Sequence, residues 1–141
     1  QHPPGLPRLR AIVENWLKWT GSAKLPGGCV MTAAAYEFDD HPGPVKDLIS
    51  QSLRELRKTL ARAAHTAIEA GQLRADTDPE QLAFEICSIY LGAQLDARLF
   101  GEPNAWRRAL DAFESLISRP RGEPQASAGP VQSGQQRPFA A

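Results

Sequence analysis

The sequence predicts an all-α fold, because three features of it agree. Apolar residues recur every three or four positions along most of the chain, which is the period of an α-helix. No segment alternates apolar and polar residues for long enough to indicate a β-strand. Proline and glycine divide the periodic part into separate segments. We therefore expect five helices, at about residues 7–20, 28–38, 44–70, 79–100 and 103–118.

The first three helices differ in how their apolar residues are arranged. The first has Leu9, Val13 and Leu17 on one stripe, and its Pro7 suits a first turn, where a missing N–H leaves no bond unmade. The second reads GCVMTAAAYEF and carries almost no charge, so we expect protein to surround it. The third has one continuous apolar stripe and is expected to stop at Gly71.

The fourth helix begins with a recognisable capping sequence. Asp78 is placed to accept hydrogen bonds from the free N–H groups of the first turn, and Pro79 fits the first helical position. Gln81 is expected to reach back to the cap, as in a capping box.

From Leu82 to Phe100 the fourth helix is apolar on more than one side. A helix of a small domain buries only one face in its own core, so the second face needs a partner. We predict a homodimer in which the last two long helices of each subunit form a four-helix bundle. Packing within one subunit alone does not account for the extra apolar face. The predicted interface residues are Leu91, Gly92, Leu95, Leu99, Trp106, Leu110, Phe113 and Ile117, with Arg98 and Arg107 as a charged rim.

Composition excludes several classes of function. Sixteen basic residues balance sixteen acidic ones, so no overall field attracts nucleic acid or anionic lipid. The one basic cluster lies opposite an apolar helix face, and we interpret it as a solvated surface. No signal peptide or membrane-spanning run is present, which favours a cytoplasmic protein without a membrane partner. The basic cluster consists of Arg54, Arg57, Lys58 and Arg62.

Cysteine and histidine spacing predicts neither a metal site nor a cofactor. Cys29 and Cys87 are far apart and belong to no Cys-x-x-Cys pair, and three scattered histidines add no ligand spacing. Both cysteines are interpreted as buried free thiols. Beyond Pro120 the chain is rich in Pro, Gly, Gln and Ser, which predicts a disordered tail at 120–141. We expect a loose segment at 1–5 and one folded domain at 6–119.

The order of several motifs carries a resemblance to a known family. An LPGGC turn leads into an alanine-rich helix that ends in YEFDD, and HPGPVKD then opens a long helix. AGQLRADTDPEQLAF and LGAQLDARLFGEP follow. From about Leu6 to Ile117 the chain resembles the C-terminal regulatory domain of TetR-family transcriptional regulators of bacteria. These regulators begin with a DNA-binding head that contains a helix-turn-helix. Nothing before Leu6 encodes one, so operator DNA is expected to bind only through a head absent from this sequence.

The resemblance implies a ligand-sensing mechanism. In TetR-type regulators a small effector enters a cavity in this domain and changes the spacing of the two DNA-binding heads. We therefore expect a repressor released by a small hydrophobic or aromatic effector. For each residue, ordinary core packing remains an alternative. The residues expected to line the cavity are Trp16, Trp19, Cys29, Thr32, Ala33, Tyr36, Leu53, Leu56, Phe84, Cys87 and Tyr90.

Alternative functions have to fit the same residues. Cys29 near a helix N-terminus admits redox or electrophile sensing, although a structural or pocket-lining thiol is favoured. Glu37, Asp39 and Asp40 are clustered, but they flank a Pro-Gly break where acidic residues commonly serve loops and caps, so no enzyme is predicted. A stand-alone helical dimerisation protein without DNA binding has the same expected fold and remains an alternative.

Overall fold

The computed structural model describes residues 2–22 and 28–118. Within these ranges it contains helices and turns and no β-strand, which confirms the predicted all-α fold of five helices. The observed ends lie within a few residues of the predicted ones. The helices are α1 (Leu6–Ser22), α2 (Val30–Glu37), α3 (Pro44–Glu69), α4 (Pro79–Arg98) and α5 (Ala105–Ile117).

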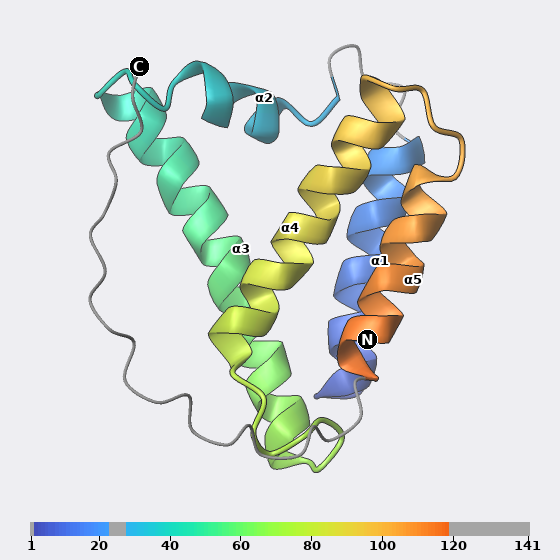
Figure 1. Ribbon diagram of the computed structural model, residues 1–141. Coiled ribbons are helices and arrows are strands. Elements are labelled where there is room, and N and C mark those ends of the chain that lie inside the picture. Colours follow the sequence, from blue (N-terminus) through green and yellow to red (C-terminus); the bar gives the residue numbers. More distant parts are fainter. Residues whose placement is uncertain (1, 23–27, 119–141) are drawn as a thin grey trace, which may run out of the picture.

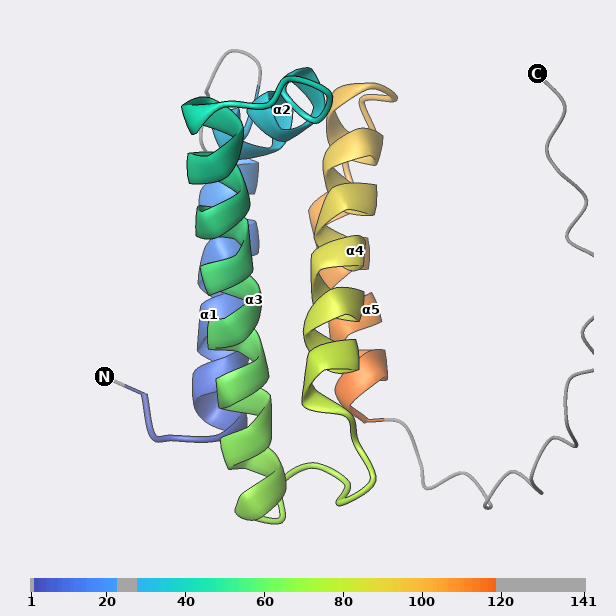
Figure 2. The same ribbon diagram turned by 90° about the vertical axis from the view of Figure 1, so that its left-hand side faces the viewer.

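The long helices form two layers, one of α1 and α3 and the other of α4 and α5 (Figure 2). In one view α3 lies in front of α1, and α4 lies in front of α5 (Figure 2). Helix α3 packs most extensively on α4, which in turn packs on α5. Figure 1 shows that α3 and α4 converge near their connecting turn and diverge at the other end, where the short helix α2 lies across the opening. This divergence leaves room for a cavity beneath α2.

The core lies between the layers. Leu9 and Val13 of α1 meet Leu60 of α3 and Phe113 of α5 there, and all four side chains are fully enclosed. Small residues on α3 allow the close approach of neighbouring helices, since Ala63, Ala64 and Ala67 are all buried. The apolar stripes predicted for the long helices therefore face one shared core.

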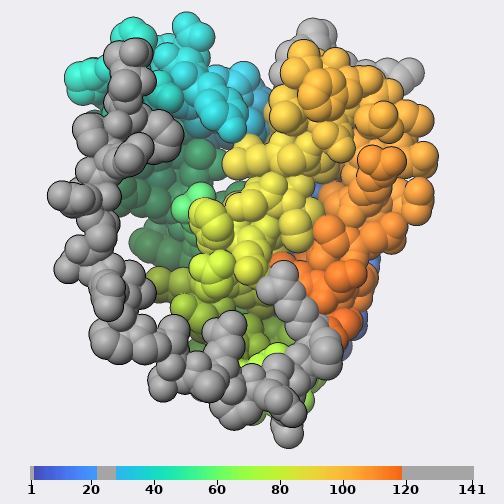
Figure 3. All heavy atoms as spheres, in the orientation of Figure 1, coloured from blue at the N-terminus to red at the C-terminus, as the bar shows by residue number. Residues whose placement is uncertain are grey.

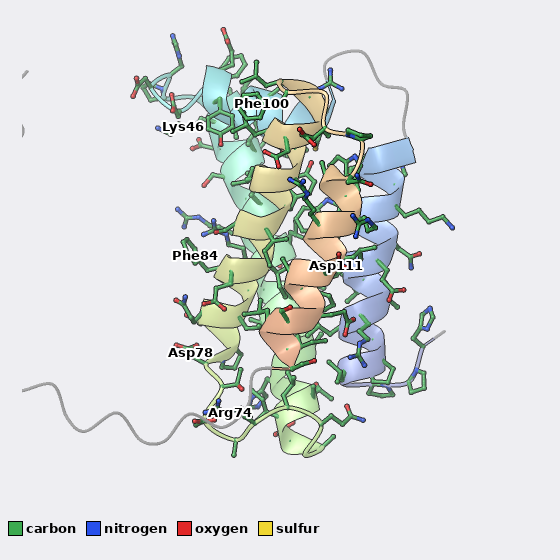
Figure 4. The ribbon with its side chains drawn as sticks, turned by 45° about the vertical axis from the view of Figure 1, so that its right-hand side comes forward. Lys46, Arg74, Asp78, Phe84, Phe100 and Asp111 are labelled. Atoms are coloured by element: carbon green, nitrogen blue, oxygen red, sulfur yellow. The ribbon has the colours of Figure 1, made fainter. Side chains whose placement is uncertain are left out.

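The α3–α4 connection confirms two of the predicted helix ends. Gly71 has a φ of 68°, and the N–H groups of Gly71 and Gln72 donate to the carbonyls of Ile68 and Ala67, which is a Schellman motif. The Asp78 carboxylate accepts from the N–H groups of Glu80 and Gln81 at 2.9 and 3.2 Å. Asp78 and Arg74 mark this connection in Figure 4.

The predicted capping box at Gln81 is wrong. The Gln81 amide nitrogen instead donates to the Glu85 carboxylate at 3.2 Å, one turn further along the helix. An i,i+4 pair on the same helical face satisfies the amide without bending it back to the cap.

The prediction that protein surrounds the second helix is also wrong. None of the residues of α2 is buried, and Val30 and Tyr36 are 73% and 68% exposed. The reason is geometric, because α2 crosses the open end of the bundle as a single layer and packs mainly on α3. Its lack of charge therefore does not reflect burial within this chain.

The tail predicted at 120–141 lies outside the described residues. At the other end, the Gly5 carbonyl accepts a hydrogen bond from the Leu9 N–H at 3.0 Å and so caps the first turn of α1. Across residues 2–22 and 28–118, no helix has the length and apolar character needed to span a bilayer.

Candidate ligand-binding cavity

A cavity of about 610 Å³ lies beneath α2, between α1, α3 and α4. In the space-filling view the surface recedes between α3 and α4 on this side of the molecule (Figure 3). The volume falls within the range of small-molecule sites, which is about 300–1,000 Å³. The lining residues are Trp16, Trp19, Cys29, Val30, Met31, Thr32, Ala35, Tyr36, Asp39, Ser50, Leu53, Arg54, Leu56, Arg57, Cys87, Tyr90 and Leu91.

Nine of the eleven residues expected to line a cavity come together in this one. They derive from four helices and the turn before α2, so the fold gathers positions that are far apart in the sequence. The nine are Trp16, Trp19, Cys29, Thr32, Tyr36, Leu53, Leu56, Cys87 and Tyr90.

Two of the expected residues do not line the cavity. Ala33 is exposed, because it lies about a quarter turn away from the face that Thr32, Ala35 and Tyr36 direct inward. Phe84 lies one turn before Cys87, toward the end where α3 and α4 converge, and its ring extends outward from α4 (Figure 4). There the Arg57 guanidinium stands 5.8 Å from the ring centroid.

The lining also includes residues that the sequence analysis did not select. Leu91 was expected at a dimer interface. Arg54 and Arg57 were interpreted as part of a solvated face; both are exposed, as predicted, and they also line the cavity. On α3, Ser50, Leu53, Arg54 and Arg57 follow the spacing of three and four residues that places side chains on one face. This spacing could have indicated from the sequence that the other three side chains share one face of α3 with the selected Leu53. The other lining residues not selected are Val30, Met31, Ala35 and Asp39.

Stacked aromatic rings form the inner wall. The rings of Trp16 and Tyr90 are 4.2 Å apart between centroids and nearly parallel, and Trp106 tilts against Tyr90 at 6.2 Å. These three side chains join α1, α4 and α5, and Tyr90 is almost completely buried. The wall is therefore part of the core and offers a rigid apolar surface to the cavity.

Polar groups meet at one end of this wall. The Tyr90 hydroxyl hydrogen-bonds to the Gln94 side chain and lies close to Cys29 and Thr32. Burial alone raises the pKa of the Cys29 thiol. Hydrogen bonds to the Tyr90 hydroxyl and to Thr32 and Met31 outweigh burial, so that the pKa is lowered. Burial, followed by the neighbouring Cys29, raises the pKa of Tyr90 well above its ordinary value.

The two cysteines have different environments, which corrects the expectation that both are buried. Cys87 is buried, and burial raises its pKa although the Arg57 guanidinium nearby acts in the opposite direction. Cys29 is half-buried at the N-terminus of α2. Among the described residues, no group of three or more His, Cys, Asp and Glu side chains is arranged to hold a metal ion.

The residues predicted for a dimer interface separate into two sets. On α4, Leu91, Leu95 and Leu99 are exposed, and Gly92 faces open space. With Phe84 these leucines follow the spacing of one helical face, and we call Phe84, Leu91, Leu95 and Leu99 the α4 stripe. Its exposure explains why the sequence of α4 is apolar on more than one side.

The α5 residues of the predicted interface pack at least partly within their own chain. Phe113 is 0% exposed in the single chain, so its side chain belongs to the core of its own domain, and its place in an interface stays a prediction. Trp106, Leu110 and Ile117 are half-buried against the same core. The apolar face of α5 is thus used by its own domain. In the expected rim, Arg107 pairs with Asp111 at 3.2 Å, and Arg98 lies against Gly28.

Comparison with protein families identifies the class of protein. Residues 5–113 match the family model described as "Tetracyclin repressor-like, C-terminal domain". The chain therefore belongs to this family of TetR C-terminal domains, as the motif order predicted. Domains of this family are regulatory domains of TetR-type transcriptional regulators. No curated protein matches the chain.

Proposed function

We propose that this domain senses a small apolar or aromatic effector in the cavity beneath α2, within a homodimeric transcriptional repressor that the effector releases from DNA. The observation that carries the proposal is the cavity itself. It combines mostly apolar walls with a few polar groups, which is the usual composition of a small-molecule site. DNA binding is attributed to a head joined to this domain.

Helix α1 is suited to transmit the state of the cavity. Its C-terminal half contributes Trp16 and Trp19 to the lining. The N-terminal half of α1 is hydrogen-bonded to the turn after α3 and to α5. The Leu6 N–H donates to the Gln72 side chain at 2.8 Å, and Arg10 forms two hydrogen bonds to Glu114. A ligand that fits one position of α1 better than another shifts the equilibrium by that difference in affinity.

Helix α2 is the part of the cavity wall best able to adjust. It is short, has no buried residue and packs mainly on α3. Segments with few buried contacts open at low cost in free energy. Ligand contacts to Met31 and Thr32 would stabilise one position of α2 and thereby enclose the cavity.

The α4 stripe supplies the proposed dimer interface. It is a run of exposed apolar side chains on a single helix face, which soluble monomers seldom leave uncovered. A two-fold axis would place the stripe against its own copy, because an isologous interface uses the same surface twice. Leu91 belongs both to the stripe and to the cavity lining, so the interface and the cavity would share a side chain.

A filling mutation tests the proposed sensor. Ala35 lines the cavity, whereas Ala33 of the same helix is exposed and does not, so Ala35→Trp and Ala33→Trp form a matched pair. The probe is N-phenylnaphthylamine, an uncharged dye that becomes fluorescent in apolar surroundings. We expect saturable binding to the wild-type chain, a loss of at least tenfold in affinity for Ala35→Trp and little change for Ala33→Trp.

The opposite pattern would refute the proposal. If Ala35→Trp melts like the wild type and binds the dye with the same affinity, the cavity is not the binding site. If the wild-type chain binds no dye and still dimerises, the stand-alone dimerisation protein becomes the better account.

A further inference from the structure

The cavity carries more positive than negative charge. Its lining includes Arg54 and Arg57, both exposed, and among the described residues one acidic residue, Asp39. These groups sum to a formal charge of +1. The Lys46 ammonium group donates a hydrogen bond to the backbone carbonyl of Asp39, which brings a further cation to this part of the chain.

Neither cavity arginine has a carboxylate partner within residues 2–22 and 28–118. Elsewhere, Arg10 pairs with Glu114 at 2.7 Å and Arg74 pairs with Asp76. Arg57 instead contacts the ring of Phe84 and influences the thiol of Cys87. The two arginines are three residues apart on α3, so both project from the same side of the helix.

This arrangement selects among apolar ligands by charge. A guanidinium group donates two parallel hydrogen bonds to a carboxylate or a sulfonate, and such charge-assisted bonds are stronger than neutral ones. An uncharged ligand would gain the same apolar contacts with Trp16, Met31 and Leu56 but nothing from the arginines. The structure therefore favours a ligand with an apolar body and an acidic group at one end.

We propose that the effector is an apolar organic anion whose acidic group binds between Arg54 and Arg57, an inference that rests on the proposed sensor function. Its body lies against Trp16, Met31 and Leu56, and the cluster of Cys29, Thr32 and Tyr90 is available to any further polar group of the ligand. Arg54 and Arg57 thus determine specificity for charge, while the apolar walls supply affinity.

Two dyes with a common ring system test this assignment. Anilinonaphthalenesulfonate carries a sulfonate, and N-phenylnaphthylamine is the same skeleton without it. We expect Arg54→Gln combined with Arg57→Gln to weaken binding of the sulfonate by roughly tenfold. Binding of the uncharged dye should stay within about twofold of the wild type, because it makes no ion pair. Added salt should weaken binding of the sulfonate dye and leave binding of the uncharged dye unchanged.

Arg62→Gln is the matched control, since Arg62 is an exposed arginine of the same helix outside the cavity lining. It should change neither affinity. The proposal is overturned if the double variant weakens both dyes equally, or weakens neither. The proposed sensor function would survive either result if Ala35→Trp still removes binding of the uncharged dye. Binding of both dyes that is insensitive to Ala35→Trp would refute the sensor function itself.

Discussion

Replacing Leu95 by glutamate tests the proposed dimer interface most sharply. Leu95 is at the centre of the α4 stripe and is 51% exposed in the single chain. Full burial of a leucine side chain stabilises by about 1.5–3 kcal/mol, so the exposed half represents about 1 kcal/mol. A two-fold interface contains two copies of each residue, which gives about 2 kcal/mol per dimer and roughly a 30-fold change in Kd for Leu95→Ala.

Glutamate should weaken the dimer further, because a two-fold axis brings both new carboxylates into one apolar interface. We expect wild-type chains to sediment as dimers at micromolar concentration and Leu95→Glu chains as monomers, with unchanged helical circular dichroism. Leu48→Glu is the control, since Leu48 is 65% exposed but belongs to α3. The proposed interface would be refuted if the wild-type chain is a monomer. It would also be refuted if the Leu95→Glu variant sediments as a dimer like the wild type.

Three further predictions concern the thiols, the core and a helix cap. Because the pKa of Cys29 is lowered and that of Cys87 is raised, alkylation of Cys29 should be the faster reaction, and its rate should rise with pH over a lower pH range than the rate of Cys87. Cys29→Ser should remove the fast phase, and loss of the slow phase instead would contradict the assignment. Phe113→Ala should destabilise the fold by about 3–5 kcal/mol in urea denaturation, whereas a residue used only between subunits would leave the monomer unaffected. Asp78→Ala should cost about 1 kcal/mol by the same measurement, and no change would show that the cap is dispensable.

The sequence predicted helices and their ends well where the cause is local. The stop at Gly71 and the start at Asp78 depend on backbone geometry and on hydrogen bonds between near neighbours. Gln81 shows the limit of such rules, because two local partners were available and the sequence does not rank them.

What covers an apolar face could not be predicted in the same way. Phe113 and Leu95 are both apolar residues on amphipathic helices, yet one is enclosed by the core and the other is exposed. Period and composition show that a face is apolar. They do not show whether its partner is the same chain, a ligand or a second copy, because that depends on how the helices diverge. The exposure of α2 has the same origin.

The charged part of the candidate site was missed for a related reason. Arg54 and Arg57 look like an ordinary solvated surface in the sequence, since arginines on the polar side of a helix are usually exposed. They line the cavity because α3 forms one of its walls and α2 lies across its end. Only the arrangement of three helices reveals that this surface borders an apolar space.

A crystal structure with a bound probe would show whether the cavity beneath α2 is the effector site. In crystals of the chain saturated with N-phenylnaphthylamine, the dye should lie against Trp16, Met31 and Leu56. Dye bound only on the α4 stripe, with the cavity unoccupied, would refute the proposed sensor function.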